Sequence, residues 1–250
     1  MPHYKRINSE SGYYHVISRG INKMNIFDED NDYKNFINLI RIYSKKYEIS
    51  VVAYCLMKNH FHILIKDTQK NRSMFVRCIK QIYSSDYNQR NNRIGPLFND
   101  RFKDKPIDKT EYLKIVFRYI LLNPEKAGIA KYDKYLWSSY QEYFKQDTFL
   151  DMNCVLKICG DTHNIRNLLE EKDWTNCVYS DDPIINYRIE SELYKTFGIY
   201  DISITYFLSN EKKFEIIKLL LNNGLTINKI SNLTRIKKWQ ISYILNRTCP

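Results

Sequence analysis

Two apolar segments separated by only two polar residues constrain the fold of this chain most strongly. Residues 49–57 and 60–66 are apolar and rich in β-branched or aromatic side chains, and the pair 58–59 between them is Lys-Asn. Two such segments with so short a connection predict a β-hairpin. In the second segment apolar residues alternate with His60 and His62, so a period of two places both histidines on one face of the strand.

The two histidines are a candidate metal site. Their Cα atoms would stand about 7 Å apart, twice the rise per residue of a strand, which is close enough for both imidazoles to bind one cation. The chain has five histidines, and the other three lie elsewhere, so the pair does not belong to a histidine-rich tract. The alternative is a half-buried strand with two polar residues on its wetter face. The spacing alone does not separate these interpretations.

The elements around the hairpin predict an α+β fold. Their order with the hairpin is β-α-β-β-α-β followed by a helix, which is the ferredoxin-like split βαβ arrangement, an antiparallel sheet with its helices on one face. In that topology the first and third strands are central, so we expect His15 to lie beside the histidine strand. The predicted elements outside the hairpin are a strand at 12–20, a helix at 28–46, a helix at 71–90, a strand at 101–107 and a helix at 110–122 that stops at Asn123 and Pro124.

The C-terminal residues predict a helix-turn-helix. An amphipathic helix at 211–223 ends at Gly224, a short helix follows Thr226, and a turn at 234–235 leads into a last helix at 237–247. Any bundle of three helices has this pattern too, so a purely structural role is the alternative. In a DNA-binding domain the polar side chains of the last helix would contact DNA. They are Lys237, Lys238, Gln240, Tyr243 and Arg247.

The charge of the chain favours a polyanionic partner. Lys and Arg number 39 against 28 Asp and Glu, which gives a formal net charge of +11. Such an excess favours nucleic acid first and an anionic membrane second, although a basic charge can also serve solubility alone. A membrane-surface protein needs a basic amphipathic helix with bulky apolar anchors, and no segment supplies one convincingly. We therefore expect no membrane partner.

The sequence predicts a cytoplasmic protein with reduced thiols. The first residues are polar and charged and lead into no apolar signal segment. No apolar run is long enough to cross a bilayer. The six cysteines are scattered without a C-x-x-C spacing, which indicates free thiols and not a disulfide framework or a zinc site.

A second segment, residues 118–128, carries a candidate nucleophile. Tyr119 and Asn123 are four positions apart, so a helix would place the phenol and the carboxamide on one face. The chain has 21 tyrosines, so a structural ring is the alternative. Basic residues near Phe98 and around this helix could hold a DNA strand by phosphate contacts, and a solvated run of charge is their alternative. They are Arg101, Lys103, Lys105, Arg118 and Lys126.

Several segments in a fixed order resemble one family. The segment 60–62 resembles the His-hydrophobic-His motif of the HUH single-strand nucleases. Its surroundings are similar in order and spacing to the REP-associated tyrosine transposases, within the IS200-like superfamily, over residues 10–145. The segments that carry this similarity are 14–20, 54–62, 95–103, 118–128 and 137–140.

The resemblance, which covers residues 10–145, and the pattern of the later residues together predict three regions. Residues 1–145 would be an HUH tyrosine transposase catalytic domain. Residues 146–204 would be a helical linker region of unknown role, with a boundary at the Asp-Asp-Pro sequence 181–183. Residues 205–250, which go beyond the minimal family pattern, would be the helix-turn-helix-like DNA-binding domain.

The resemblance also implies a metal-dependent transesterification on single-stranded DNA beside a hairpin. Tyr119 would carry over as the nucleophile that forms a 5′-phosphotyrosine link. His60, His62 and Asn123 would carry over as ligands of Mg²⁺ or Mn²⁺. His15 is a candidate to deprotonate the phenol, whose ordinary pKa is near 10.

The implied partners are single-stranded or hairpin DNA, with duplex DNA as a further partner of the C-terminal domain. Relatives include monomers and homodimers, so both states stay open. The alternative function is a DNA-binding regulator whose nuclease centre is idle. Duplex binding without cleavage under any divalent ion would favour that alternative, whereas the intact residues His60, His62 and Tyr119 argue against it.

Overall fold

The chain divides into two compact units, Met1–Leu169 and Glu170–Pro250, and each is described here by itself. The structure is a computed structural model that describes residues 8–99, 101–108, 110–170 and 202–247, together with residues 189, 192, 193, 196 and 197. The boundary expected at 181–183 lies outside the described residues. Within the described part, no helix combines the length and apolar character that a membrane span requires.

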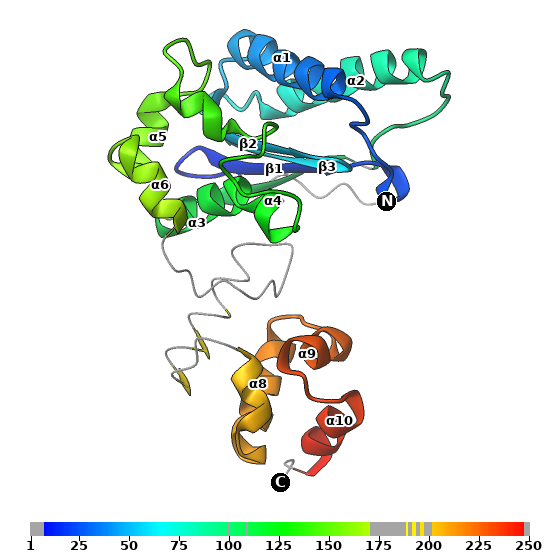
Figure 1. The fold of residues 1–250 in the computed structure, drawn as a ribbon, viewed down its shortest axis with the longest axis vertical. Helices are drawn as coiled ribbons and strands as arrows, with labels where there is room; N and C mark the ends of the chain where they lie inside the picture. The colour runs from blue at the N-terminus through cyan, green and yellow to red at the C-terminus, as the bar shows by residue number, and fades with distance from the viewer. Residues whose placement is uncertain are drawn as a thin grey trace. The chain divides into compact units, whose positions relative to one another are not determined.

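A four-stranded antiparallel sheet organises the first unit (Figure 1). Its strand order is β2-β3-β1-β4, so β1 and β3 are central. The predicted β-α-β-β-α-β order and the central place of the first and third strands are confirmed. The elements are β1 (Tyr13–Arg19), α1 (Asp30–Lys46), β2 (Ser50–Met57), β3 (His60–Lys66), α2 (Arg72–Arg90), β4 (Lys103–Ile107) and α3 (Thr110–Leu121), with a one-turn helix η1 (Ile21–Lys23) after β1.

Different helices cover the two faces of the sheet. On β3, Phe61 points toward α1, and its ring centroid lies 4.9 Å from that of Phe36. Helices α1 and α2 pack together on this side, as predicted, and α3 lies on the opposite side, where it contacts β2 and β3 (Figure 1). Because side chains alternate along a strand, the face that α3 covers carries His60 and His62.

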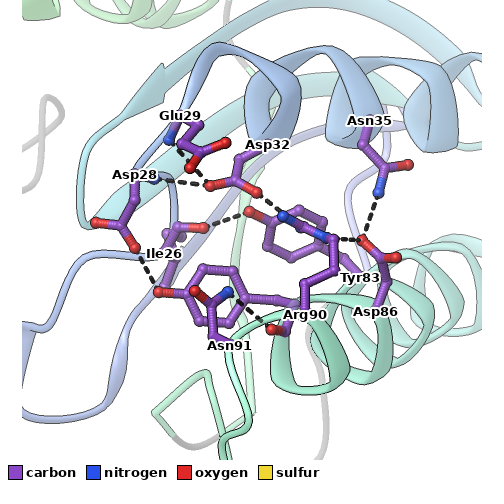
Figure 2. Close-up of polar contacts among 10 residues, drawn as sticks. Ile26, Asp28, Glu29, Asp32, Asn35, Tyr83, Asp86, Arg90 and Asn91 are labelled. Carbon is purple, nitrogen blue, oxygen red and sulfur yellow. Dashed lines mark hydrogen bonds and ion pairs between the residues drawn. The ribbon is translucent and has the colours of Figure 1, made fainter.

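A set of polar contacts, which we call the polar clamp, ties the start of α1 to the end of α2 (Figure 2). The buried Asp32 carboxylate accepts hydrogen bonds from the backbone N–H groups of Asp28 (2.8 Å) and Glu29 (3.1 Å). It also accepts one from Arg90 Nη2 at 2.7 Å. The Tyr87 hydroxyl donates to the Asp28 carboxylate. Asp32 therefore caps α1 and holds α2 at the same time.

The chain after α3 completes the first unit. Residues 137–139 run along the outer edge of β2, where the N–H of Leu56 donates to the Trp137 carbonyl (2.9 Å) and the N–H of Tyr54 donates to Ser139 Oγ (3.0 Å). Helix α5 (Met152–Cys159) buries Val155 and Ile158 in the same core as the sheet. The first unit thus extends past residue 145 into part of the expected linker. The remaining elements are α4 (Asn123–Lys126), η2 (Ser139–Phe144), α5 (Met152–Cys159) and α6 (His163–Glu170).

The second unit has a core of its own. Ser209 and Thr226 cap two of its helices by accepting hydrogen bonds from the backbone N–H groups of Lys212 and Lys229. The helices lie close to where the sequence predicts them, and their function as a helix-turn-helix stays a prediction. The elements are η3 (Ile202–Phe207), α8 (Asn210–Asn222), α9 (Ile227–Thr234) and α10 (Lys238–Arg247). The core includes Ile216, Ile217, Leu220, Ile230, Ile236 and Ile241.

Candidate active site on the histidine face

Three histidines gather on the sheet face that α3 covers, which we call the histidine face. His60 and His62 both project from β3, with ring centroids 5.0 Å apart. Antiparallel pairing sets Ile17 of β1 opposite His62, which brings His15 to the same face. His15 Nε2 lies 2.9 Å from His62 Nδ1, and the two rings stack with centroids 5.1 Å apart. The expectation that His15 lies beside the histidine strand is confirmed.

Tyr119 reaches the histidine face from α3. Its ring centroid lies 5.5 Å from that of His62 and 6.0 Å from that of His15, in both cases edge to face. Lys126 Nζ lies 5.7 Å from the centroid of the same phenol ring. The structure therefore brings the candidate nucleophile close to a candidate metal ligand that is far away in the sequence.

The surroundings of His62 keep its imidazole neutral. Burial lowers the pKa of His62 well below its ordinary value, and the charges of His15, His60, Arg19 and Lys105 lower it further. A neutral imidazole offers a nitrogen lone pair to a cation. Because Nδ1 contacts His15, Nε2 is the nitrogen of His62 that could bind a metal.

His60 is oriented in a similar way. Its Nδ1 lies 2.6 Å from Asn59 Oδ1, and an amide oxygen only accepts hydrogen bonds, so Nδ1 donates and Nε2 is the nitrogen that could bind a cation. Two imidazoles on one face, each with Nε2 available, fit a divalent cation. Of the residues that the structure describes, no group of three or more His, Cys, Asp or Glu is arranged to hold a metal ion. The other ligands would therefore be oxygens of an amide, water or phosphate.

The structure corrects the expected position of Asn123, the candidate third ligand. We expected one helix to carry both Tyr119 and Asn123, but α3 ends at Leu121 and Asn123 is the first residue of α4. The helix therefore stops close to where the sequence predicts, at Asn123 and Pro124, because Pro124 has no N–H for the helical ladder and its ring crowds the preceding turn. Tyr119 and Asn123 consequently belong to two helices. The role of Asn123 as a ligand stays a prediction.

Three basic side chains share the histidine face. The pairing of β4 with β1 sets Lys105 opposite His15, and Lys103 lies two positions away on the same face. Arg19 lies opposite His60 in the pairing of β1 with β3. Sequence reasoning missed Arg19, although its separation of four residues from His15 on one strand already indicates the same face.

The other basic residues predicted in the first unit lie in different places. Lys126 is exposed beside the Tyr119 ring. Arg118 is buried, with 8% of its surface exposed. It therefore does not lie on the surface, where a contact with DNA was expected. Arg101 lines a separate pocket beside α2.

The candidate DNA contacts of the second unit lie on and before α10. Gln240 is partly used within the unit, because its Oε1 accepts a hydrogen bond from the backbone N–H of Lys237 at 3.1 Å. Trp239, which sequence reasoning did not single out, is 64% exposed. The side chain of Arg247 lies outside the described part. The exposed predicted residues are Lys237, Lys238 and Tyr243.

Comparison with known proteins gives a family match and two similar structures. Residues 8–123 match the family described as Transposase IS200 like. A solved REP-associated tyrosine transposase bound to a REP hairpin is 16% identical, with a TM-score of 0.49, over 59% of this chain and 88% of that chain. A Deinococcus radiodurans structure described as a transposase is 17% identical, with a TM-score of 0.33, over 46% of this chain and 92% of that chain. No curated protein matches this chain.

Proposed function

We propose that this chain is a metal-dependent endonuclease and strand transferase for single-stranded DNA, of the REP-associated tyrosine type, because residues 8–123 match the IS200-like transposase family. It cuts beside a DNA hairpin through a 5′-phosphotyrosine intermediate. The observation that supports this most is the 5.5 Å approach of the Tyr119 ring to His62. A phenol beside two candidate metal-binding imidazoles suits metal-assisted transesterification.

Each of these residues has a role in the proposed reaction. The Nε2 atoms of His60 and His62 and the amide oxygen of Asn123 hold Mg²⁺ or Mn²⁺, which when bound acts as a Lewis acid on the phosphate. Tyr119 Oη loses its proton and attacks the phosphorus, and the bond from phosphorus to the 3′ oxygen breaks. The 3′ oxygen takes up a proton. One phosphodiester replaces another, so the cut strand can be rejoined.

Basic side chains around the histidine face position the DNA strand. Lys103, Lys105 and Arg19 share that face and would contact phosphates, which fixes the register of a strand without reading its sequence. Lys126 lies 5.7 Å from the phenol ring, so a phosphate that it binds lies next to the nucleophile.

Formation of a covalent adduct tests this proposal. The full chain is incubated with Mg²⁺ and a hairpin-bearing single-stranded oligonucleotide, and a protein–DNA adduct that survives denaturing electrophoresis is expected. Tyr119→Phe keeps the ring but removes the hydroxyl, so it abolishes the adduct. Tyr112→Phe, earlier on α3, is the matched control and retains it. An adduct that survives Tyr119→Phe but is lost in Tyr112→Phe would refute the assignment of the nucleophile.

The second unit supports an additional role in binding duplex DNA. Lys237 and Lys238 are exposed at the start of α10, and the N-terminal end of a recognition helix is the part that usually meets base edges. If the histidine centre were idle, the chain would be a DNA-binding regulator. In that case duplex DNA would be shifted in a gel and no cleavage would occur under any divalent ion.

A further inference from the structure

A pocket of about 460 Å³ lies away from the histidine face, between α2 and residues 96–102. This volume is in the range of small-molecule sites. Among the described residues that line it, three are cationic and none is acidic. The side chains that matter here are the apolar Met74, Phe98 and Phe102 and the cationic Arg77, Lys80 and Arg101.

The floor of this pocket is fixed to the strands that carry the candidate active site. Phe98 forms a β-bridge with Gly20, and the N–H of Asn99 donates to the carbonyl oxygen of Arg19 at 2.8 Å. The centroid of the Phe98 ring lies 6.0 Å from that of Phe61. Phe61 lies between His60 and His62 in the sequence of β3, and its side chain points to the opposite face of the sheet. The pocket is therefore anchored behind the histidine face, at the end of β1.

The lining combines the exposed Met74 and the small exposed parts of the Phe98 and Phe102 rings with positive charge. Lys80 Nζ lies 4.9 Å from the centroid of the Phe98 ring, and Arg77 and Arg101 add two guanidinium groups. Aromatic side chains bind nucleobases, and cations beside them bind the phosphates of the same strand. A concave pocket admits an unstacked base, which only an unpaired nucleotide presents.

Basic residues also connect the pocket to the histidine face. Lys103 and Lys105 of β4 lie on that face. Arg101 lies two positions before the start of β4 and lines the pocket. A DNA strand held by the two lysines would have to pass around the start of β4, an edge strand of the sheet, to reach the pocket on the other face. We propose that the pocket binds one unpaired nucleotide of the DNA strand that flanks the cleavage site. This inference rests on the proposed function.

A series of oligonucleotides that each lack one base tests this proposal. Affinity is measured with the full chain carrying Tyr119→Phe, so that no cleavage occurs. Removal of the base at one flanking position is expected to weaken binding roughly tenfold, whereas neighbouring positions have little effect. If no flanking position shows this dependence, the proposal is overturned.

Two variants connect that dependence to the pocket. Arg77→Glu reverses an exposed charge at its rim, and Gln81→Trp fills its mouth; each is expected to remove the effect of the missing base. Lys45→Glu, an exposed charge reversal on α1, is the matched control and keeps it. If both pocket variants still bind the oligonucleotide with the missing base more weakly, the base binds to another surface. If Arg77→Glu does not change the affinity for DNA, the pocket binds a different ligand.

Adduct formation with the intact Tyr119 distinguishes this proposal from the proposed function. If binding depends on the missing base but no adduct forms, the proposed cleavage reaction is contradicted and the pocket proposal is not. If an adduct forms but binding does not depend on any base, the pocket proposal is contradicted and the cleavage reaction is not.

Discussion

The contact between His15 and His62 determines how a candidate metal ligand is oriented. Both side chains are buried, and His15 Nε2 lies 2.9 Å from His62 Nδ1. The sequence suggested His15 as a base for the phenol of Tyr119. Because its Nε2 faces His62, the geometry favours a positioning residue that fixes the ring and directs His62 Nε2 toward a metal.

Substitution of His15 tests this role. His15→Leu removes the contact with His62, and the leucine side chain fills the buried space. We therefore expect adduct formation to be about 10- to 100-fold slower at low Mn²⁺, with partial recovery at high Mn²⁺. Titration of the adduct rate with Mn²⁺ measures this. Oligonucleotide affinity without metal should not change. A lower maximal rate with an unchanged Mn²⁺ dependence would instead indicate a base.

The lowered pKa of His62 predicts acid sensitivity of the metal-free fold. Below about pH 6.5, the ordinary pKa of histidine, the unfolded chain binds a proton at His62 that the folded chain excludes by burial. The free energy of unfolding contributed by this group is therefore unaffected above that pH and falls as the pH decreases below it. His62→Gln is expected to flatten this fall in urea unfolding curves. His163→Gln, at a histidine that is 92% exposed, is the control variant.

For single residues, the sequence predicts which face of a strand a side chain occupies better than it predicts how exposed that side chain is. The period of two on β3 and β1 places His15, His60 and His62 correctly, since one register fixes all side chains of a strand. Arg118 was predicted as a DNA contact from its charge, yet it is buried. A helix that packs across a sheet covers much of its own circumference, and the sequence does not reveal how much.

At the scale of elements, strands and helices followed from their periodicity, but packing partners did not. Helices α5 and α6 carry apolar stripes, which indicate burial without naming the surface that buries them. The structure places Val155 and Ile165 in the core of the first unit. The end of α3 was predicted from Asn123 and Pro124, because a proline has no N–H to continue a helix.

The polar clamp predicts unequal effects of substitutions on α1 and α2. Asp32→Ala removes both the cap of α1 and the buried partner of Arg90, so we expect a loss of about 2 kcal/mol in the free energy of unfolding. Arg90→Ala costs under about 1 kcal/mol, because the Arg90 side chain is 40% exposed and Asp32 keeps its backbone donors. Chemical denaturation of the full chain measures both losses.

Asp86→Ala is the matched control for the polar clamp. Asp86 pairs with the same arginine and accepts a hydrogen bond from Asn35 of α1 at 2.9 Å. Its side chain is 41% exposed, so its loss should change stability by less than about 1 kcal/mol. Equal losses in all three variants would contradict the central place of Asp32.

At the scale of the whole molecule, the two units have separate cores, which predicts a division of labour. Ile202 packs in the second core, so a deletion from residue 205, the expected domain start, would strip that core. Deletion of 170–250 is the better test. We expect it to weaken duplex binding in gel shifts and to spare adduct formation on a good oligonucleotide.

A double substitution keeps both units and serves as the companion to that deletion. Lys237→Glu with Lys238→Glu changes exposed charges on the second unit and should reproduce the loss of duplex binding. Loss of the adduct in either protein would contradict the division of labour.

The strand order has a consequence for synthesis on the ribosome. β1 is made first, but its two neighbours in the sheet are β3 and β4, and β4 ends only at Ile107. A nascent chain must therefore keep β1 unpaired on one side until β4 has emerged, and contacts so distant in sequence form slowly. Tyr119 emerges later still. A nascent chain that ends before α3 therefore lacks the proposed nucleophile.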